Sequence, residues 1–128
     1  MQRCDVAWLF VRVEHAQDLE SFSKKAFALL NIAIKETRYS DNWPGGRYVL
    51  AEVLGLKIRL SLADDSDFPD YHFWITFEPQ VGWGDDTHSL DGLADAVAKH
   101  LALHGMKIAR PLSFKAGSGS VVYGDNVT

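Results

Sequence analysis

The sequence predicts a single α+β domain in which two amphipathic helices cover one face of a mostly antiparallel sheet. Three observations support this prediction. The chain has 128 residues, which is the usual length of one domain. Hydrophobic residues make up 47% of it and charged residues 23%, a balance typical of a globular core rather than a disordered chain. Strand-like and helix-like hydrophobic patterns alternate along the chain, and no internal repeat occurs.

The N-terminal third predicts a strand, a helix and a turn. Residues 6–13 are apolar at both alternations, which is typical of a strand covered on both faces. Residues 18–36 have apolar side chains at helical spacing, and Asp18 is positioned to cap the helix. The string TRYSDNWPGG at 37–46 is rich in turn-forming residues and predicts a loop.

The middle of the chain predicts three consecutive strands. Residues 47–54 and 56–62 are strand-like, and the short gap between them predicts a tight hairpin at Leu54–Gly55. Residues 63–70 form an acidic loop, and residues 71–78 alternate apolar and polar side chains as the third strand.

The C-terminal part predicts a second helix and a last strand. A loop at 80–88 precedes the helix, which is expected to end near Gly105. Residues 106–114 are strand-like. Residues 115–128 read as a flexible tail, in which Val121–Tyr123 either adds a short edge strand or frays.

The resulting order is β-α-β-β-β-α-β, with about five strands. It resembles a ferredoxin-like two-layer sandwich with one strand added to the meander. Because each helix has a single apolar stripe, we expect both helices to lie on the same face of the sheet.

The opposite face of the predicted sheet contains most of the candidate binding residues. On each strand, the alternation that includes a charged residue is assigned to this outer face, since side chains alternate between the two faces. Aromatic side chains beside cations are expected there, and such a patch is typical of a partner-binding surface. The candidates are Trp8, Phe10, Tyr48, Leu50, Arg59, His72 and Trp74.

The string NWPGGRY at 42–48 is the most distinctive in the chain. It predicts a tight turn on which Trp43 and Arg47 add an aromatic and a cationic contact to the binding surface. In the structural alternative, Trp43 only covers the edge of the sheet.

The candidate metal and catalytic residues have simpler structural explanations. Asp86 and His88 could share a metal or act as a general base, but they also fit the start of a helix. His100 and His104 have zinc-helix spacing without the glutamate that a metalloprotease helix needs. Cys4 has no catalytic signature around it.

The acidic loop at 63–70 lacks the ligand spacing of a calcium loop, although its charge could attract a basic protein partner. No catalytic motif stands out anywhere in the chain, so the sequence favours a non-enzymatic protein with no cofactor and no metal.

Charge and composition limit the expected partners and location. Lys and Arg number 13 against 17 Asp and Glu, and the net charge of −4 argues against binding to nucleic acid. No apolar run is long enough to span a membrane. A single cysteine and no recognisable signal peptide predict a cytoplasmic protein.

Two functional hypotheses follow. The first is a small bacterial-type domain that binds a protein partner, or a second copy of itself as a homodimer, through the outer face and the aromatic loops. In composition alone the chain resembles immunity proteins that neutralise bacterial toxins, which implies a protein partner. A face covered by the chain's own C-terminal segment is the structural alternative. The second hypothesis is a small-molecule pocket or small enzyme that uses His72, His88, Asp86 and Arg59.

Overall fold

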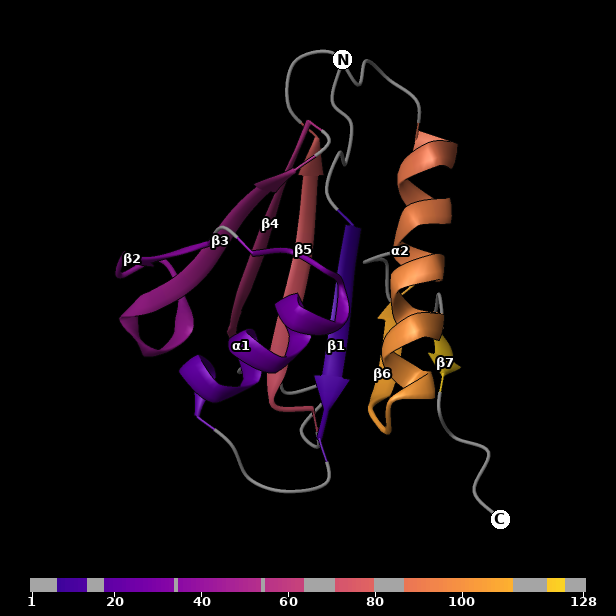
Figure 1. Ribbon diagram of the computed structural model, residues 1–128, viewed down its shortest axis with the longest axis horizontal. Helices are drawn as coiled ribbons and strands as arrows, with labels where there is room; N and C mark the ends of the chain where they lie inside the picture. Colours follow the sequence, from indigo (N-terminus) through magenta and orange to yellow (C-terminus); the bar gives the residue numbers. More distant parts are fainter. Residues whose placement is uncertain are drawn as a thin grey trace.

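The computed structural model describes residues 7–13, 18–33, 35–53, 55–63, 71–79, 87–111 and 120–123 (Figure 1). The elements are β1 (Ala7–Arg12), α1 (Leu19–Leu29), β2 (Glu36–Tyr39), the 3₁₀ turn η1 (Pro44–Gly46), β3 (Arg47–Val53), β4 (Leu56–Leu62), β5 (Phe73–Pro79), α2 (Thr87–Leu103), β6 (Lys107–Pro111) and β7 (Ser120–Tyr123).

Within the described residues the strands form one open sheet of seven in the order β2-β3-β4-β5-β1-β6-β7, and every pairing is antiparallel. The prediction of an α+β domain with a mostly antiparallel sheet and two helices is confirmed. The sheet has more strands than the five or so predicted, and the ferredoxin-like arrangement is not confirmed.

The two extra strands are the short edges of the sheet. β2 lies where the sequence predicts a turn, and all four of its side chains are exposed, so no hydrophobic alternation marks it. Its backbone pairs with β3 over Glu36↔Leu50 to Tyr39↔Arg47. β7 is the edge strand that the sequence leaves optional, and it pairs with β6. β2 is held by its backbone pairing with β3, whereas β7 also buries Tyr123 in the core.

The hairpin that the sequence predicts between residues 47–54 and 56–62 is confirmed, and it joins β3 to β4. Val53 pairs with Leu56, so residues 54 and 55 alone connect β3 to β4. Gly55 has φ of 75°, the positive value that two-residue hairpin turns require.

Helix α1 begins as the sequence predicts. The Asp18 carboxylate accepts a hydrogen bond of 2.7 Å from the backbone N–H of Ser21, and this bond lowers the pKa of Asp18. The buried positions include Leu19, Phe22 and Ala26, which lie on one face of the helix.

The same helix ends at Leu29, seven residues before the predicted end at Glu36. Asn31 adopts φ of 61°, its N–H donates to the Ala28 carbonyl (3.0 Å), and the Ile32 N–H donates to the Phe27 carbonyl (2.8 Å). These two bonds and the left-handed residue form a Schellman motif, in which Asn takes the place that glycine usually holds. The apolar residues beyond Leu29 keep helical spacing although the helix has ended, so the end predicted from that spacing is wrong.

Both helices pack on the same face of the sheet. Residues of α1 and α2 belong to one buried cluster with the inward side chains of the sheet strands. The rings of Phe22 on α1 and Phe73 on β5 stack at 4.1 Å. His100 Nε2 on α2 lies 2.7 Å from the Leu29 carbonyl oxygen at the end of α1, which joins the two helices at one end. In Figure 1, α2 runs alongside β6 and β7.

A polar network fixes β7 against α2. The Tyr123 hydroxyl donates to the Asp95 carboxylate on α2 (2.5 Å) and accepts from Arg110 Nε on β6 (3.2 Å). The hydroxyl of Tyr123 and the ammonium of Lys99, 3.1 Å away, lower the pKa of Asp95. Burial raises the pKa of Tyr123.

We expect Asn31→Ala to lower the free energy of unfolding by about 1 kcal/mol, because alanine is strained in the left-handed conformation. Asn31→Gly should be as stable as the wild type or more so. Urea unfolding of both variants measures this. Asn42→Ala, a change at an exposed loop position, is the control, and an equal loss in both alanine variants would contradict the assignment.

We expect Asp95→Asn to be less stable than the wild type at about pH 7, and the difference to shrink as the pH falls below 3.8, the ordinary pKa of this carboxyl. The folded state lowers the pKa of Asp95, so its stabilisation exists above the unfolded pKa and disappears on protonation. Thermal unfolding at about pH 7 and about pH 3 tests this. Asp41→Asn at an exposed loop position is the control, and a pH-independent difference would refute the role of the charge.

Candidate functional site

The sheet face opposite the helices, called the outer face below, contains most of the predicted binding residues. One cross-strand row runs through five strands as Trp8, Thr76, Arg59, Leu50 and Glu36. A second row contains Ala109, Phe10, Trp74 and Ser61. The alternation of charged and apolar residues assigned the members of these rows other than Glu36 and Ala109 to the same face, although it did not give the strand order.

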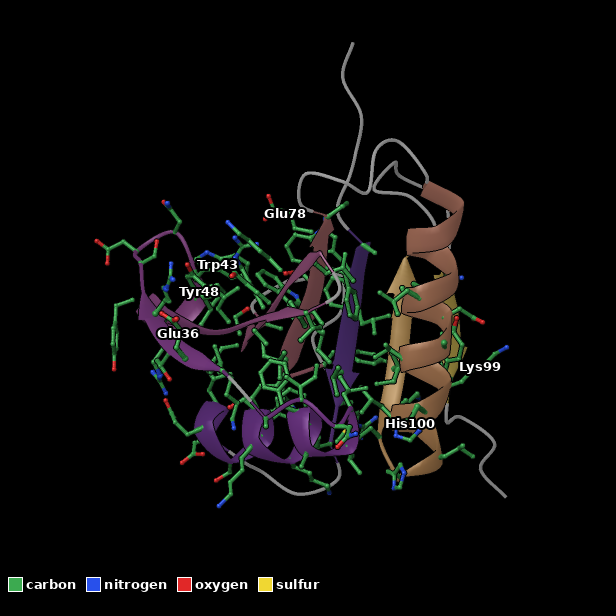
Figure 2. The ribbon with its side chains drawn as sticks, turned by 45° about the horizontal axis from the view of Figure 1, so that its top comes forward. Glu36, Trp43, Tyr48, Glu78, Lys99 and His100 are labelled. Carbon is green, nitrogen blue, oxygen red and sulfur yellow. The ribbon has the colours of Figure 1, made fainter. Side chains whose placement is uncertain are left out.

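Arg59 lies at the centre of this outer face. Its Nη1 is 2.5 Å from a Glu78 carboxylate oxygen, across the β4–β5 pair. The guanidinium carbon lies 5.9 Å from the ring centre of Trp43 and 5.6 Å from that of Tyr48, within cation–π range. Figure 2 shows Trp43, Tyr48 and Glu78 on the side of the sheet away from α1. The Arg59 side chain is 17% exposed, so its charge is largely removed from water.

The loop between β2 and β3 positions Trp43 over this face. The Ser40 N–H donates to the Gly46 carbonyl (3.0 Å) and the Gly46 N–H donates to the Trp43 carbonyl (2.8 Å), which closes the loop. Gly45 has φ of 74°, and a Cβ there would lie 2.7 Å from the Leu62 side chain. The turn therefore requires glycine at position 45. The ring centre of Trp43 lies 5.0 Å from that of Tyr48.

A second aromatic group lies on the β1–β5 side of Arg59. Trp74 meets Trp8 edge-on at 5.1 Å and Phe10 edge-on at 6.1 Å between ring centres. These are preferred geometries for aromatic pairs, so the three rings stabilise one another. Trp8 and Trp74 are half-buried.

The predicted exposure of this face is wrong at two positions. Phe10 is 1% exposed and Leu50 is 4% exposed, and neither belongs to the core cluster beneath the helices. Each has large neighbours on the same face, Trp74 opposite Phe10 and Arg59 opposite Leu50. Side chains directly opposite lie within about 5.5 Å of one another, so the larger ones cover the smaller. The outer face is therefore a packed layer with half-buried rings rather than a bare apolar patch.

Two buried polar atoms in this layer have no hydrogen-bond partner among the described residues. They are Thr76 Oγ1 and Trp74 Nε1. Thr76 is 2% exposed and lies between Trp8 and Arg59 in the cross-strand row. An unpaired buried polar group destabilises a fold by about 1–3 kcal/mol, so such groups are rare away from binding sites.

Arg47 is the predicted binding residue that lies elsewhere. Its guanidinium is bonded to both carboxylate oxygens of Glu20 on α1 (2.8 and 3.1 Å), on the helix side of the sheet. This pairing lowers the pKa of Glu20. Arg47 alternates with Tyr48, so the two cannot share a face of β3. Arg47 therefore lies on the opposite face of the sheet from Tyr48 and Arg59.

Of the remaining candidate residues, His72 lies two residues before Trp74 of the outer face, and several others lie outside the described residues. His72 is exposed before β5, and its ring lies 6.5 Å from that of Phe73. Cys4, the 64–70 acidic cluster and Asp86 lie outside the described residues, as does the side chain of His88.

His100 on α2 contacts the end of α1, whereas His104 lies just after α2 and is exposed. The rings of His100 and His104 are 5.0 Å apart, and His100 is bonded to the Leu29 carbonyl. In the part of the chain that the structure describes, no three His, Cys, Asp or Glu side chains gather as a metal site. No helix in that part is long and apolar enough to cross a membrane.

Sequence reasoning did not select Glu78 and Thr76 as site residues, although it placed both on the outer face. Their importance depends on which strand lies beside β5, because Arg59 is opposite Thr76 and Lys57 is opposite Glu78. Opposite charges at Lys57 and Glu78 are a signal that could have suggested the pairing.

Comparison of the chain with protein-family models, curated proteins and solved structures finds no match.

We expect Thr76→Val to raise the free energy of unfolding by about 1 kcal/mol, because it replaces an unpaired buried hydroxyl with a methyl group of similar shape. Chemical denaturation measures the change. Thr37→Val on the exposed edge strand β2 is the control and should change stability by less than about 0.5 kcal/mol. A loss of stability in Thr76→Val would mean that the hydroxyl has a partner in solution.

Proposed function

We propose that this chain is a non-enzymatic binding domain that recognises a protein partner through Arg59 and the rings around it. The observation that carries the proposal is the Arg59 guanidinium, held by Glu78 and by the rings of Trp43 and Tyr48 in the middle of the outer face. The expected cytoplasmic location is part of the same proposal.

The composition and burial of this group support recognition of a protein. Trp, Tyr and Arg are the residues most enriched where binding energy concentrates, near the centre of an interface in well-packed positions. Trp43 and Tyr48 are half-buried, and Phe10 and Leu50 beneath the layer are buried. The rings are thus held in place before a partner arrives, so little side-chain entropy is lost on binding.

The charge of the outer face supports a partner with acidic side chains. The described strands place five cationic side chains on this face and three anionic ones, although the whole chain has a net charge of −4. The cations are Arg12, Arg38, Lys57, Arg59 and Lys107, and the anions are Glu36, Glu52 and Glu78. Complementary charge favours encounter with an acidic surface. The basic partner expected for the acidic loop concerns residues outside the described part of the chain.

The alternative of a pocket or small enzyme that uses His72, His88, Asp86 and Arg59 has no specific support among the described residues. His72 is exposed, and neither Asp86 nor the side chain of His88 is described. We therefore retain it only as an outcome of the test below.

The test compares two ion-paired arginines on opposite faces. Affinity capture from the cells that produce the protein, with the wild type, Arg59→Ala and Arg47→Ala as baits, should retain a protein that only Arg59→Ala loses. The purified partner should then bind Arg59→Ala at least about tenfold more weakly by calorimetry, and its affinity should fall with added salt. Thermal unfolding confirms that each variant is folded.

The outcomes separate the possible occupants of the site. The proposal would be rejected if the captured protein binds Arg59→Ala and Arg47→Ala equally. It would also be rejected if no captured protein depends on Arg59 for binding. Light scattering at high micromolar concentration tests the homodimer: a dimer that Arg59→Ala dissociates would make a second copy the partner instead. A small molecule retained by the wild type and lost from Arg59→Ala would favour the alternative.

A further inference from the structure

The helices are too few to cover the inner face of the sheet. Seven strands about 4.8 Å apart span roughly 29 Å between the outermost strand axes, whereas each helix is about 10 Å wide with its side chains. α1 packs near β3 and β4, and α2 packs near β1 and β6. A cavity of about 310 Å³ lies between the end of α1 and α2, over the strands that neither helix fully covers.

The walls of this cavity are fixed in position. Leu30 and Ile32 form one wall and belong to the Schellman turn that ends α1, where two backbone hydrogen bonds hold them. Leu93 and Val97, four residues apart on α2, form the other. The hydrogen bond between His100 and the Leu29 carbonyl holds α2 to the end of α1 (Figure 2 labels His100). The spacing of the two walls is therefore set by bonded elements.

The floor is part of the core. Ile58 of β4 and Phe77 of β5 are opposite each other in the sheet, and both are buried. Because these side chains are packed against the rest of the inner face, the floor cannot rise to fill the space. A cavity enclosed by packed residues on three sides is a preformed one.

The lining determines the chemistry of the occupant. All the described lining residues are apolar except Asn31 at the rim, and none of them is charged. A charged group inside would lose its hydration without a counter-charge, which is strongly unfavourable. The volume lies at the lower end of the range for small-molecule sites. The NH₂ group and the carbonyl oxygen of the Asn31 side chain offer donors and an acceptor for a polar end at the rim.

We propose that this cavity binds a small uncharged molecule with a hydrocarbon body, at a site distinct from the partner surface on the outer face. The two sites use different residues: the cavity is lined by the turn after α1, by α2 and by inward side chains of the strands, and Arg59 lies on the opposite side of the sheet. This inference does not depend on the proposed function, so either can fail alone.

The probe is N-phenyl-1-naphthylamine, an uncharged apolar dye whose fluorescence rises on burial. The wild type should bind it saturably with one site per chain. Leu93→Trp, which extends a wall residue into the cavity, should weaken binding at least about tenfold. Leu103→Trp is the matched control, because it adds the same side chain to an exposed position on the same helix, and its affinity should stay within about twofold.

Amide chemical shifts identify where the dye binds. Shifts that concentrate at residues 30–32 and 93–97 support the proposal, whereas shifts at Trp43 and Trp74 would place the dye on the outer face and overturn it. Non-saturable binding, or equal binding by Leu93→Trp and Leu103→Trp, would also overturn it. If Leu93→Trp does not fold, Val53→Phe tests the same cavity from the β3 side.

Discussion

The separation of this molecule into two chemically different faces depends on the antiparallel register of β1, β5 and β4. Pairing Leu9 with Ile75 and Ile75 with Leu60 directs three buried side chains toward the helices. The same register directs Trp8, Thr76 and Arg59 to the other face. Because side chains alternate along a strand, a slip of one residue in any of these strands would exchange its core residues with its outer ones.

That register explains how much the sequence could predict. Alternation along each strand is a local property, so the grouping of Trp8, Tyr48, Arg59 and Trp74 on one face follows from the sequence. The order of the strands is a long-range property: β1 lies between β5 and β6, which are more than 60 residues from it along the chain. The position of Trp8 beside Thr76 therefore needed the structure.

The wrong predictions have local physical causes. The helical spacing of apolar residues continues past Leu29, but Asn31 adopts a left-handed conformation that ends the helix. Strand β2 has four exposed side chains and so no hydrophobic signal. Phe10 and Leu50 are buried by larger neighbours across the strands, a contact that alternation alone does not reveal.

The edge strand β2 also has a consequence for association through the backbone. An outermost strand presents unpaired amide and carbonyl groups, which can recruit a strand from another molecule and start fibrillar growth. β2 offers only four residues, and its Glu36 and Arg38 side chains form an ion pair at 2.6 Å. A short edge of this kind, occupied by charges that would have to be desolvated, is a poor template for adding further strands. Its brevity protects the domain from polymerising along that side.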